Sequence, residues 1–179
     1  MTARHPVQVP AALTTSLAGE AWRTWTDALP DLAEDFFHRW DLRLDGSAAH
    51  GVVALALPVR RPDGSAALLK LQPVDEETRG EPLALRTWGT RHAVDLLEHD
   101  PDTGTMLLER LDASRSLQNV PDSVQALQDL SAFLAHLIAV PAPPGLPRPA
   151  DIAQAMIDRL PASRPSKTKG IQQPGTTVL

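Results

Sequence analysis

The stretch that decides the fold is "AALLKLQPVD", residues 66–75, in which a single lysine interrupts a run of leucines. Only three of the 17 basic residues in the 179-residue chain are lysines, at positions 70, 167 and 169. On a strand, Lys70 points to the opposite face from Leu69 and Leu71. A lysine on the inner face of a sheet is costly unless a carboxylate or a phosphate meets it. The position of Lys70 therefore predicts a specific partner.

The segments around this stretch predict an antiparallel sheet. Upstream, "DLRLDG" (41–46) and "VVALALPVRR" (52–61) alternate in hydrophobicity, and "RPDG" (61–64) has the proline, aspartate and glycine of a tight turn. Downstream, "AVDLLEHD" (93–100) and "TMLLERL" (105–111) are joined by the turn signal "PDTG". Together with residues 65–73, these segments predict five strands, with a helix between the third and the fourth.

Helical periodicity predicts the remaining elements. A short helix is expected from Pro10 to Leu17, and residues 19–40 read as two helical pieces broken near Pro30. Residues 76–90 predict a helix that stops at Gly89, and Asp122 is suited to cap a helix over 122–140. One further short helix is expected over 150–160. Residues 161–179 are polar and aperiodic, which is typical of disorder.

Composition narrows the possible functions. The net charge is −5 and no basic stripe stands out, which argues against nucleic acid as the main partner. The absence of cysteine excludes disulfides and thiolate metal sites. The N-terminus lacks the pattern of a signal peptide, and the longest apolar stretch, "LSAFLAHLIAV", is too short to span a bilayer. We therefore expect a cytoplasmic protein without a membrane partner.

Two carboxylates could meet Lys70 from the helix that follows it. Glu81 is the better candidate because Leu85 and Trp88 lie on the packing side beyond it, but Glu77 is an alternative. A strand lysine paired with a helix glutamate is the device with which protein kinases hold the α- and β-phosphates of ATP. The alternative without a function is that Lys70 stands at the end of a strand and its ammonium reaches water. Without a family match, that alternative is at least as well supported.

The loop "DGSAAHG", residues 45–51, joins the first two predicted strands and contains two glycines. A loop in this position could cover phosphates, but a plain hairpin turn explains it equally well. It is not a Walker loop, because Val52 stands where that motif requires lysine. His50 could contact a phosphate or simply be a solvated loop histidine.

Four phrases resemble the aminoglycoside phosphotransferase family, in its streptomycin 6-kinase and hydroxyurea phosphotransferase branch. They are "LDGSAAHGVVALALPV", "DGSAALLKLQP", "EPLALRTWGTRHAVDLLEHDPDTGTMLLERLD" and "LSAFLAHLIAVPAPPGLPRPADI". The resemblance implies an α+β fold with a protein-kinase-like N-lobe, and transfer of phosphate from ATP, with Mg²⁺, to a hydroxyl of a small molecule. It implies that Lys70 contacts the phosphates and that Glu81 orients Lys70. It also implies that the backbone of Glu109 and Leu111 contacts adenine. It places the loop residues Gly46, Ser47, His50 and Gly51 over the triphosphate.

The resemblance also divides the chain. Together with the helical periodicity of the N-terminus and the composition of the tail, it indicates an N-terminal helical segment (1–39), a kinase-like N-lobe (40–111), a partial helical C-lobe (112–160) and a disordered or aberrant tail (161–179). The His-Gly-Asp catalytic loop of the family, with its following asparagine, does not occur in the sequence, and no catalytic or metal-binding residue is assigned. We therefore expect a truncated chain that is inactive alone, through a shifted reading frame or as a natural short form. The alternative is a non-catalytic module that binds nucleotide or a partner, and the apolar helix over 124–138 could favour self-association.

Overall fold

A computed structural model describes residues 7–76, 78–89, 93–146 and 148–159 of the chain. The chain divides into two compact units, Met1–Leu146 and Pro147–Leu179. In the second unit, the described residues form one helix, α5 (Pro149–Arg159). The alternative partner Glu77 and the predicted tail over 161–179 lie outside the described residues.

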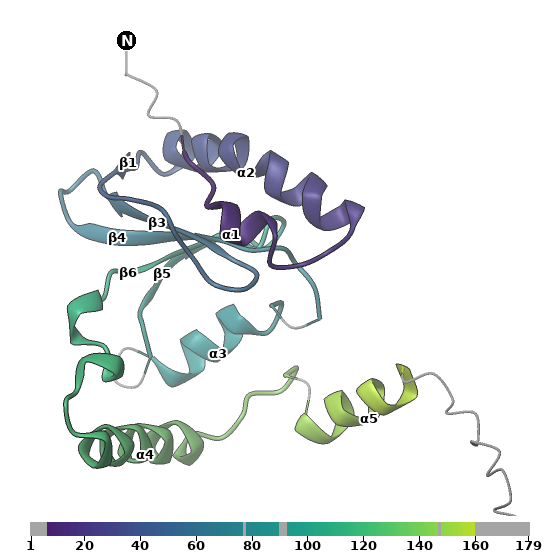
Figure 1. Cartoon of the computed structure of the whole chain (residues 1–179), viewed down its shortest axis with the longest axis vertical. Coiled ribbons are helices and arrows are strands. Elements are labelled where there is room, and N and C mark those ends of the chain that lie inside the picture. Colours follow the sequence, from purple (N-terminus) through teal and green to yellow (C-terminus); the bar gives the residue numbers. More distant parts are fainter. Residues whose placement is uncertain (1–6, 77, 90–92, 147, 160–179) are drawn as a thin grey trace, which may run out of the picture. The chain divides into compact units, whose positions relative to one another are not determined.

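The first unit combines helices with an antiparallel sheet, as the α+β expectation requires (Figure 1). Its helices are α1 (Ala11–Thr14), α2 (Glu20–Arg39), α3 (Glu81–Trp88) and α4 (Ser123–Ala139), with short 3-10 turns at Ala113–Arg115 and Leu117–Asn119. Its strands are β1 (Arg43–Leu44), β2 (Ala49–His50), β3 (Leu55–Arg60), β4 (Ala66–Leu71), β5 (Leu96–His99) and β6 (Met106–Glu109).

The sheet has the strand order β1-β3-β4-β6-β5, with β2 also paired to β3. Strands β3 and β4 form a hairpin in which Ala56 lies opposite Lys70 and Leu57 lies opposite Leu69. On its other side β4 pairs with β6, and Lys70 lies opposite Met106. Strand β4 is therefore central, and its backbone is held by hydrogen bonds on both edges.

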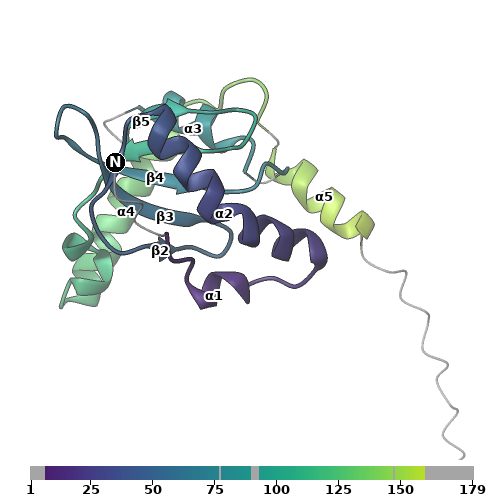
Figure 2. The same cartoon turned by 90° about the horizontal axis from the view of Figure 1, so that it is seen from above.

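The two faces of the sheet are covered by different helices. Alternate residues of β3 and β4, among them Leu57 and Leu69, pack with Leu29 and Phe36 of α2 in the larger apolar core. The opposite face carries a smaller cluster in which Leu85 of α3 packs with Met106 and Leu108 of β6. Figure 1 shows α2 on one side of the sheet and α3 on the other, and Figure 2 looks down on α2 lying across β3 and β4. Lys70 therefore projects from the face that α3 covers.

Three predictions about these elements were wrong in detail. The sheet has six strands rather than five, because Ala49–His50, within the predicted phosphate loop, pairs with Leu55 and Ala56. Helix α2 is continuous through Pro30, because apolar side chains on both sides of the proline, such as Leu29 and Phe36, pack into the same core and offset the lost intrahelical hydrogen bond. Helix α3 begins at Glu81 rather than near residue 76, because Asp75 accepts hydrogen bonds from Thr78 in a turn before the helix.

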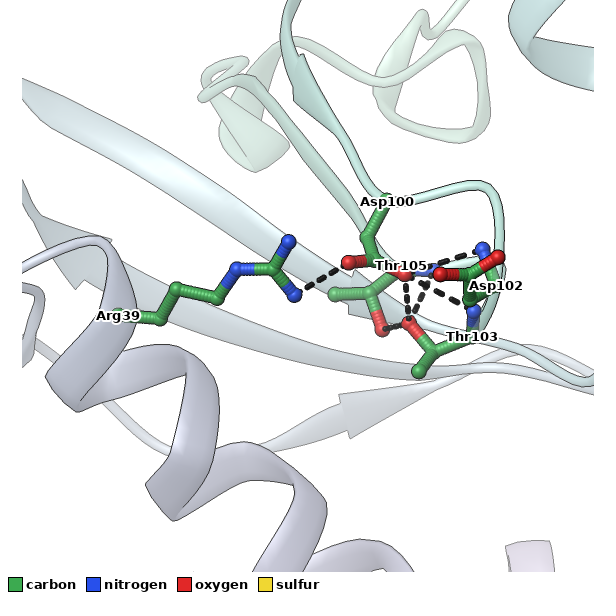
Figure 3. A network of polar contacts seen from close by, with 5 residues as sticks. All are labelled: Arg39, Asp100, Asp102, Thr103 and Thr105. Atoms are coloured by element: carbon green, nitrogen blue, oxygen red, sulfur yellow. Dashed lines mark hydrogen bonds and ion pairs between the residues drawn. The ribbon is translucent and has the colours of Figure 1, made fainter.

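The last turn of α2 is tied to the turn between β5 and β6 by a buried aspartate (Figure 3). Arg39 donates to Oδ2 of Asp100, whose exposed fraction is 3%. Oδ1 of Asp100 accepts from the amides of Asp102 (3.1 Å) and Thr103 (3.0 Å) and from the Thr103 hydroxyl (3.1 Å). The same carboxylate therefore organises the turn and anchors the helix that covers the larger core.

Helix α4 begins at the predicted cap, since Asp122 accepts hydrogen bonds from the amides of Val124 and Gln125. It is linked to α3, because Nε1 of Trp88 donates to the carbonyl of Leu137 at 3.2 Å. Apolar side chains of α4 are exposed by between 38% and 82%; they are Val124, Leu127, Leu130, Phe133, Leu134 and Ile138. None of the helices in the described residues combines the length and apolar character that crossing a membrane requires.

Candidate nucleotide site

The lysine of β4 meets the first residue of α3. Nζ of Lys70 lies 2.5 Å from Oε1 of Glu81, and the two side chains are 22% and 30% exposed. The predicted contact between Lys70 and Glu81 is confirmed. Its use in binding a nucleotide stays a prediction, because the contact alone is also what a structural ion pair would show.

The surroundings of this ion pair explain why it is well defined. Lys70 has Ala56 on one neighbouring strand and the fully buried Met106 on the other, so its aliphatic stem lies between short or apolar groups. Pro82 fixes the start of α3, and Leu85, one turn beyond Glu81, packs the helix against β6. A rigid strand and a packed helix therefore hold the ammonium and the carboxylate in register.

The predicted phosphate loop follows β1 at the edge of the sheet. Gly46 has a φ of 156°, and a side chain there would meet Pro58 at 3.3 Å. Nδ1 of His50 lies 2.9 Å from the carbonyl of Gly51, and both residues are exposed. Within the described part of the chain, no hydrogen bond or ion pair joins residues 46–51 to Lys70 or Glu81. The structure therefore brings the ion pair together without bringing the loop onto it.

Gly46 and Ser47 also line a surface hollow of about 420 Å³, together with Gln8, Pro10 and Leu57. Leu57 belongs to the core shared with α2, so this hollow lies toward the α2 face of the sheet. Lys70 projects from the other face. The hollow therefore offers no support for a phosphate site at Ser47.

The predicted adenine-binding segment directly follows β6. The amide of Glu109 donates to the carbonyl of Asp95 at 2.9 Å, and its carboxylate accepts from the amide of Asp95 at 3.3 Å. The Glu109 amide is therefore already engaged. The amide of Leu111 donates no hydrogen bond to any described residue, and the residue is 65% exposed. The Leu111 amide is thus an available donor among the described residues, and the assignment of the Glu109 and Leu111 backbone to adenine stays a prediction.

The residues described provide no evident magnesium site. Across residues 7–76, 78–89, 93–146 and 148–159, no group of three or more histidine, aspartate or glutamate side chains is placed to hold a metal ion. The Mg²⁺ that the resemblance implies therefore has no matching set of ligands in this part of the chain.

Comparison with known proteins identifies the family. The family model described as "Aminoglycoside/hydroxyurea antibiotic resistance kinase" matches residues 39–171. The chain belongs to this family. The match covers the whole sheet, α3 and α4, and therefore includes both members of the Lys70–Glu81 pair.

Curated relatives of this kinase family agree with the assignment. The chain is 47% identical to streptomycin 6-kinase of Streptomyces glaucescens over 164 residues, which cover 90% of this chain and 53% of that protein. It is 42% identical to streptomycin 6-kinase of Streptomyces griseus, covering 91% and 54% of the two chains. It is 44% identical to hydroxyurea phosphotransferase of Kitasatospora aureofaciens, covering 87% and 47%. The chain thus spans about half the length of the curated relatives it matches. No solved structure matches the chain.

One cluster beside the site was missed by sequence reasoning. Asp45, the first residue of the loop, contacts Arg110, which lies between the two predicted adenine-binding residues, and Arg60 of β3. The hydrogen bond from Arg110 holds the pKa of Asp45 below its usual range, against the effect of desolvation and with further help from Arg60. Asp45 and Arg110 are 65 residues apart, and nothing in either local sequence indicates their pairing.

Proposed function

We propose that the chain provides the nucleotide-binding lobe of an ATP-dependent phosphotransferase that acts on a hydroxyl group of a small molecule. Membership of a kinase family supports the reaction class, and the names of the relatives favour streptomycin or a hydroxyurea-like acceptor. The observation that carries the proposal is the 2.5 Å contact between Lys70 and Glu81, on a central strand and a helix of that family. We also propose that the protein acts in the cytoplasm, where ATP is available.

In the proposed site, Lys70 would contact the α- and β-phosphates, and Glu81 would fix the direction of its ammonium. A compact ammonium suits this role better than the planar fork of arginine does. The Glu109 carbonyl and the Leu111 amide would receive adenine, and Gly46, Ser47, His50 and Gly51 would cover the triphosphate. In the transfer, the γ-phosphorus forms a bond to the acceptor oxygen as its bond to the β-phosphate oxygen breaks, which yields ADP and a phosphate ester.

The proton of the acceptor hydroxyl needs a base, which the family supplies from a His-Gly-Asp loop. That sequence does not occur in these 179 residues. We therefore propose that this polypeptide alone binds ATP without turning it over. Such a chain would act as a nucleotide-binding module unless another polypeptide supplied the base.

A titration of ATP against the wild type and Lys70→Gln tests this function. We expect the dissociation constant of ATP to rise about 10- to 100-fold in Lys70→Gln, because a charge-assisted contact to phosphate is lost. Arg61→Gln is the matched control, since it removes one positive charge at the β3–β4 turn, where Arg61 pairs with Asp63. Equal weak binding by the wild type and Lys70→Gln would refute the nucleotide site. Phosphorylation of streptomycin by the purified chain would refute the absence of turnover.

The exposed apolar side chains of α4 support a second proposal, that copies of this chain associate. Leu127 is 63% exposed on that surface. We expect Leu127→Gln to lower the apparent molecular mass at a given concentration in sedimentation velocity, because it removes apolar area from the contact. Gln128→Glu on the same helix should leave the association unchanged. A wild-type chain that stays monomeric at all concentrations would contradict the proposal.

A further inference from the structure

An ion pair joins the two ends of the candidate nucleotide site. Nη1 of Arg110 lies 2.6 Å from Oδ2 of Asp45 and 3.4 Å from the carbonyl of the same residue. The two side chains are 33% and 31% exposed, so the contact is partly shielded from water. Arg60 approaches the same carboxylate oxygen with Nε at 3.3 Å. Asp45 thus has two cationic neighbours.

The ion pair crosses part of the sheet. Asp45 follows β1 and Arg110 follows β6, and β3 and β4 lie between those strands in the sheet. Neighbouring strands are about 4.8 Å apart, and Nη1 of Arg110 nevertheless reaches the backbone carbonyl of Asp45, at 3.4 Å. The long side chain of Arg110 therefore spans this distance by itself.

The position of Gly46 shows on which face the two side chains meet. A side chain at Gly46 would lie 3.3 Å from Pro58 and 3.9 Å from Nη2 of Arg110. Pro58 is paired with Leu68, and both alternate with the residues that pack against α2. They therefore share the face of Lys70. The guanidinium accordingly lies beside the start of the loop on the face where a nucleotide would bind.

The backbone strengthens this connection on the side of the loop. The amide of Asp45 donates to the carbonyl of Pro58 at 2.8 Å, so the residue is held to β3 by its main chain and to Arg110 by its side chain. Arg110 in turn separates Glu109 from Leu111, the two residues assigned to adenine. The backbone of Arg110 therefore lies in the predicted adenine-binding segment, and its guanidinium lies at the start of the loop.

We propose that Asp45 and Arg110 are positioning residues of the nucleotide site, whose ion pair fastens the phosphate-covering loop (45–51) to the adenine-binding segment (109–111). This role rests on the proposed ATP-binding function. Opening the pair leaves the backbone groups for adenine in place but removes one of the ties that hold the loop, which keeps only its main-chain bonds to β3 at Asp45 and in β2. The pair therefore supports contacts to the triphosphate more than contacts to the nucleoside.

The comparison of ATP with adenosine tests this role. In Arg110→Gln we expect the dissociation constant of ATP to rise about threefold to fivefold, the range of a partly exposed ion pair, while that of adenosine changes by less than about twofold. Arg110→Lys keeps the charge and should recover part of the loss. Arg61→Gln, which removes an equal charge at the β3–β4 turn, should leave both constants unchanged. A general loss of protein stability would weaken the binding of ATP and of adenosine together.

Three outcomes would overturn the proposal. They are an unchanged affinity for ATP, an equal loss for ATP and adenosine, and a gain in adenosine affinity, which would mean that the guanidinium obstructs the site. Amide hydrogen exchange of residues 45–51 without nucleotide separates this failure from failure of the proposed function. Exchange should be faster in Arg110→Gln and unchanged in Lys70→Gln. A wild type that binds no ATP would remove the positioning role, while faster exchange in Arg110→Gln would still show that the pair holds the loop.

Discussion

Replacing Asp100 by alanine is expected to lower the free energy of unfolding by about 2 to 4 kcal/mol, because several partly buried donors lose one buried acceptor. The amides of Asp102 and Thr103 and the Thr103 hydroxyl all donate to Oδ1 of Asp100, and Arg39 donates to Oδ2 (Figure 3). The contribution of Arg39 is the smaller one, since its side chain is 60% exposed. Urea unfolding of the two proteins, followed by circular dichroism, measures the difference.

Asp63→Ala is the matched control for this change. Asp63 accepts from the amide and the hydroxyl of Ser65 in the β3–β4 turn and pairs with Arg61, but its side chain is 60% exposed. Water can replace these contacts, so the loss should be clearly smaller than for Asp100→Ala. If the two variants lost the same stability, burial of the Asp100 network would not be the cause.

The pH dependence of the same pair of proteins provides an independent check. Desolvation opposes ionisation of Asp100, but hydrogen bonds from Thr103 and Arg39 outweigh it and lower the pKa below the ordinary value of 3.8. A carboxyl whose pKa is lower in the folded state stabilises the fold above its unfolded pKa. The difference in the free energy of unfolding between wild type and Asp100→Ala should therefore have its full size above pH 3.8. It should shrink as the pH falls through the lowered pKa of Asp100. A difference that grows on acidification would contradict this assignment.

Gly104→Ala is expected to lower the free energy of unfolding by about 2 to 4 kcal/mol, through backbone strain and a steric clash together. Gly104 has a φ of 71°, which costs any residue with a β-carbon. The added methyl would also lie 2.9 Å from Cγ2 of Val74 and 3.0 Å from the carbonyl oxygen of Gln72. The carbonyl is part of the backbone and cannot rotate away. Thermal and urea unfolding of the variant measure the loss.

Gly64→Ala separates the two contributions. Gly64 also has a positive φ, 83°, but no described atom beyond its chain neighbours lies within 4 Å of the place that a β-carbon would occupy. We expect it to lose only the conformational part, about 1 kcal/mol. Equal losses in Gly104→Ala and Gly64→Ala would show that the neighbouring segments give way and that the clash contributes nothing.

Local sequence patterns predicted the central part of the fold well. Alternation located β3 and β4, because these strands bury one side chain in two. Their Pro-Asp-Gly turn and the Pro-Asp-Thr-Gly turn between β5 and β6 located the two hairpins. The same patterns missed β2, which is two residues long and exposed on both, so that it carries no alternation. They also overestimated the effect of Pro30, since apolar contacts of Leu29, Ala33 and Phe36 hold both halves of α2 against the same core.

The candidate site was predictable only where its partners are close in sequence. Lys70 and Glu81 are 11 residues apart across one strand-to-helix connection, and the isolated lysine and the apolar spacing after Glu81 indicated the pair. The pairing of Asp45 with Arg110, and of Arg39 with Asp100, depends on the order of strands and on where α2 packs. A sequence with 17 basic and 22 acidic residues offers many such combinations, and local patterns cannot choose among them.

The placement of the tryptophans gives the two faces of the sheet separate optical signals. The chain has no tyrosine, so its near-ultraviolet emission comes from four tryptophans. Trp22 stacks on Trp25 with ring centroids 4.8 Å apart, and Trp40 lies 4.6 Å from Phe36, all on α2 or at its end. Trp88 alone lies on α3, the helix that carries Glu81. Its indole donates a hydrogen bond to the backbone of α4. A ligand that shifts α3 would therefore be reported by one fluorophore, against a background from three that stay with the larger core.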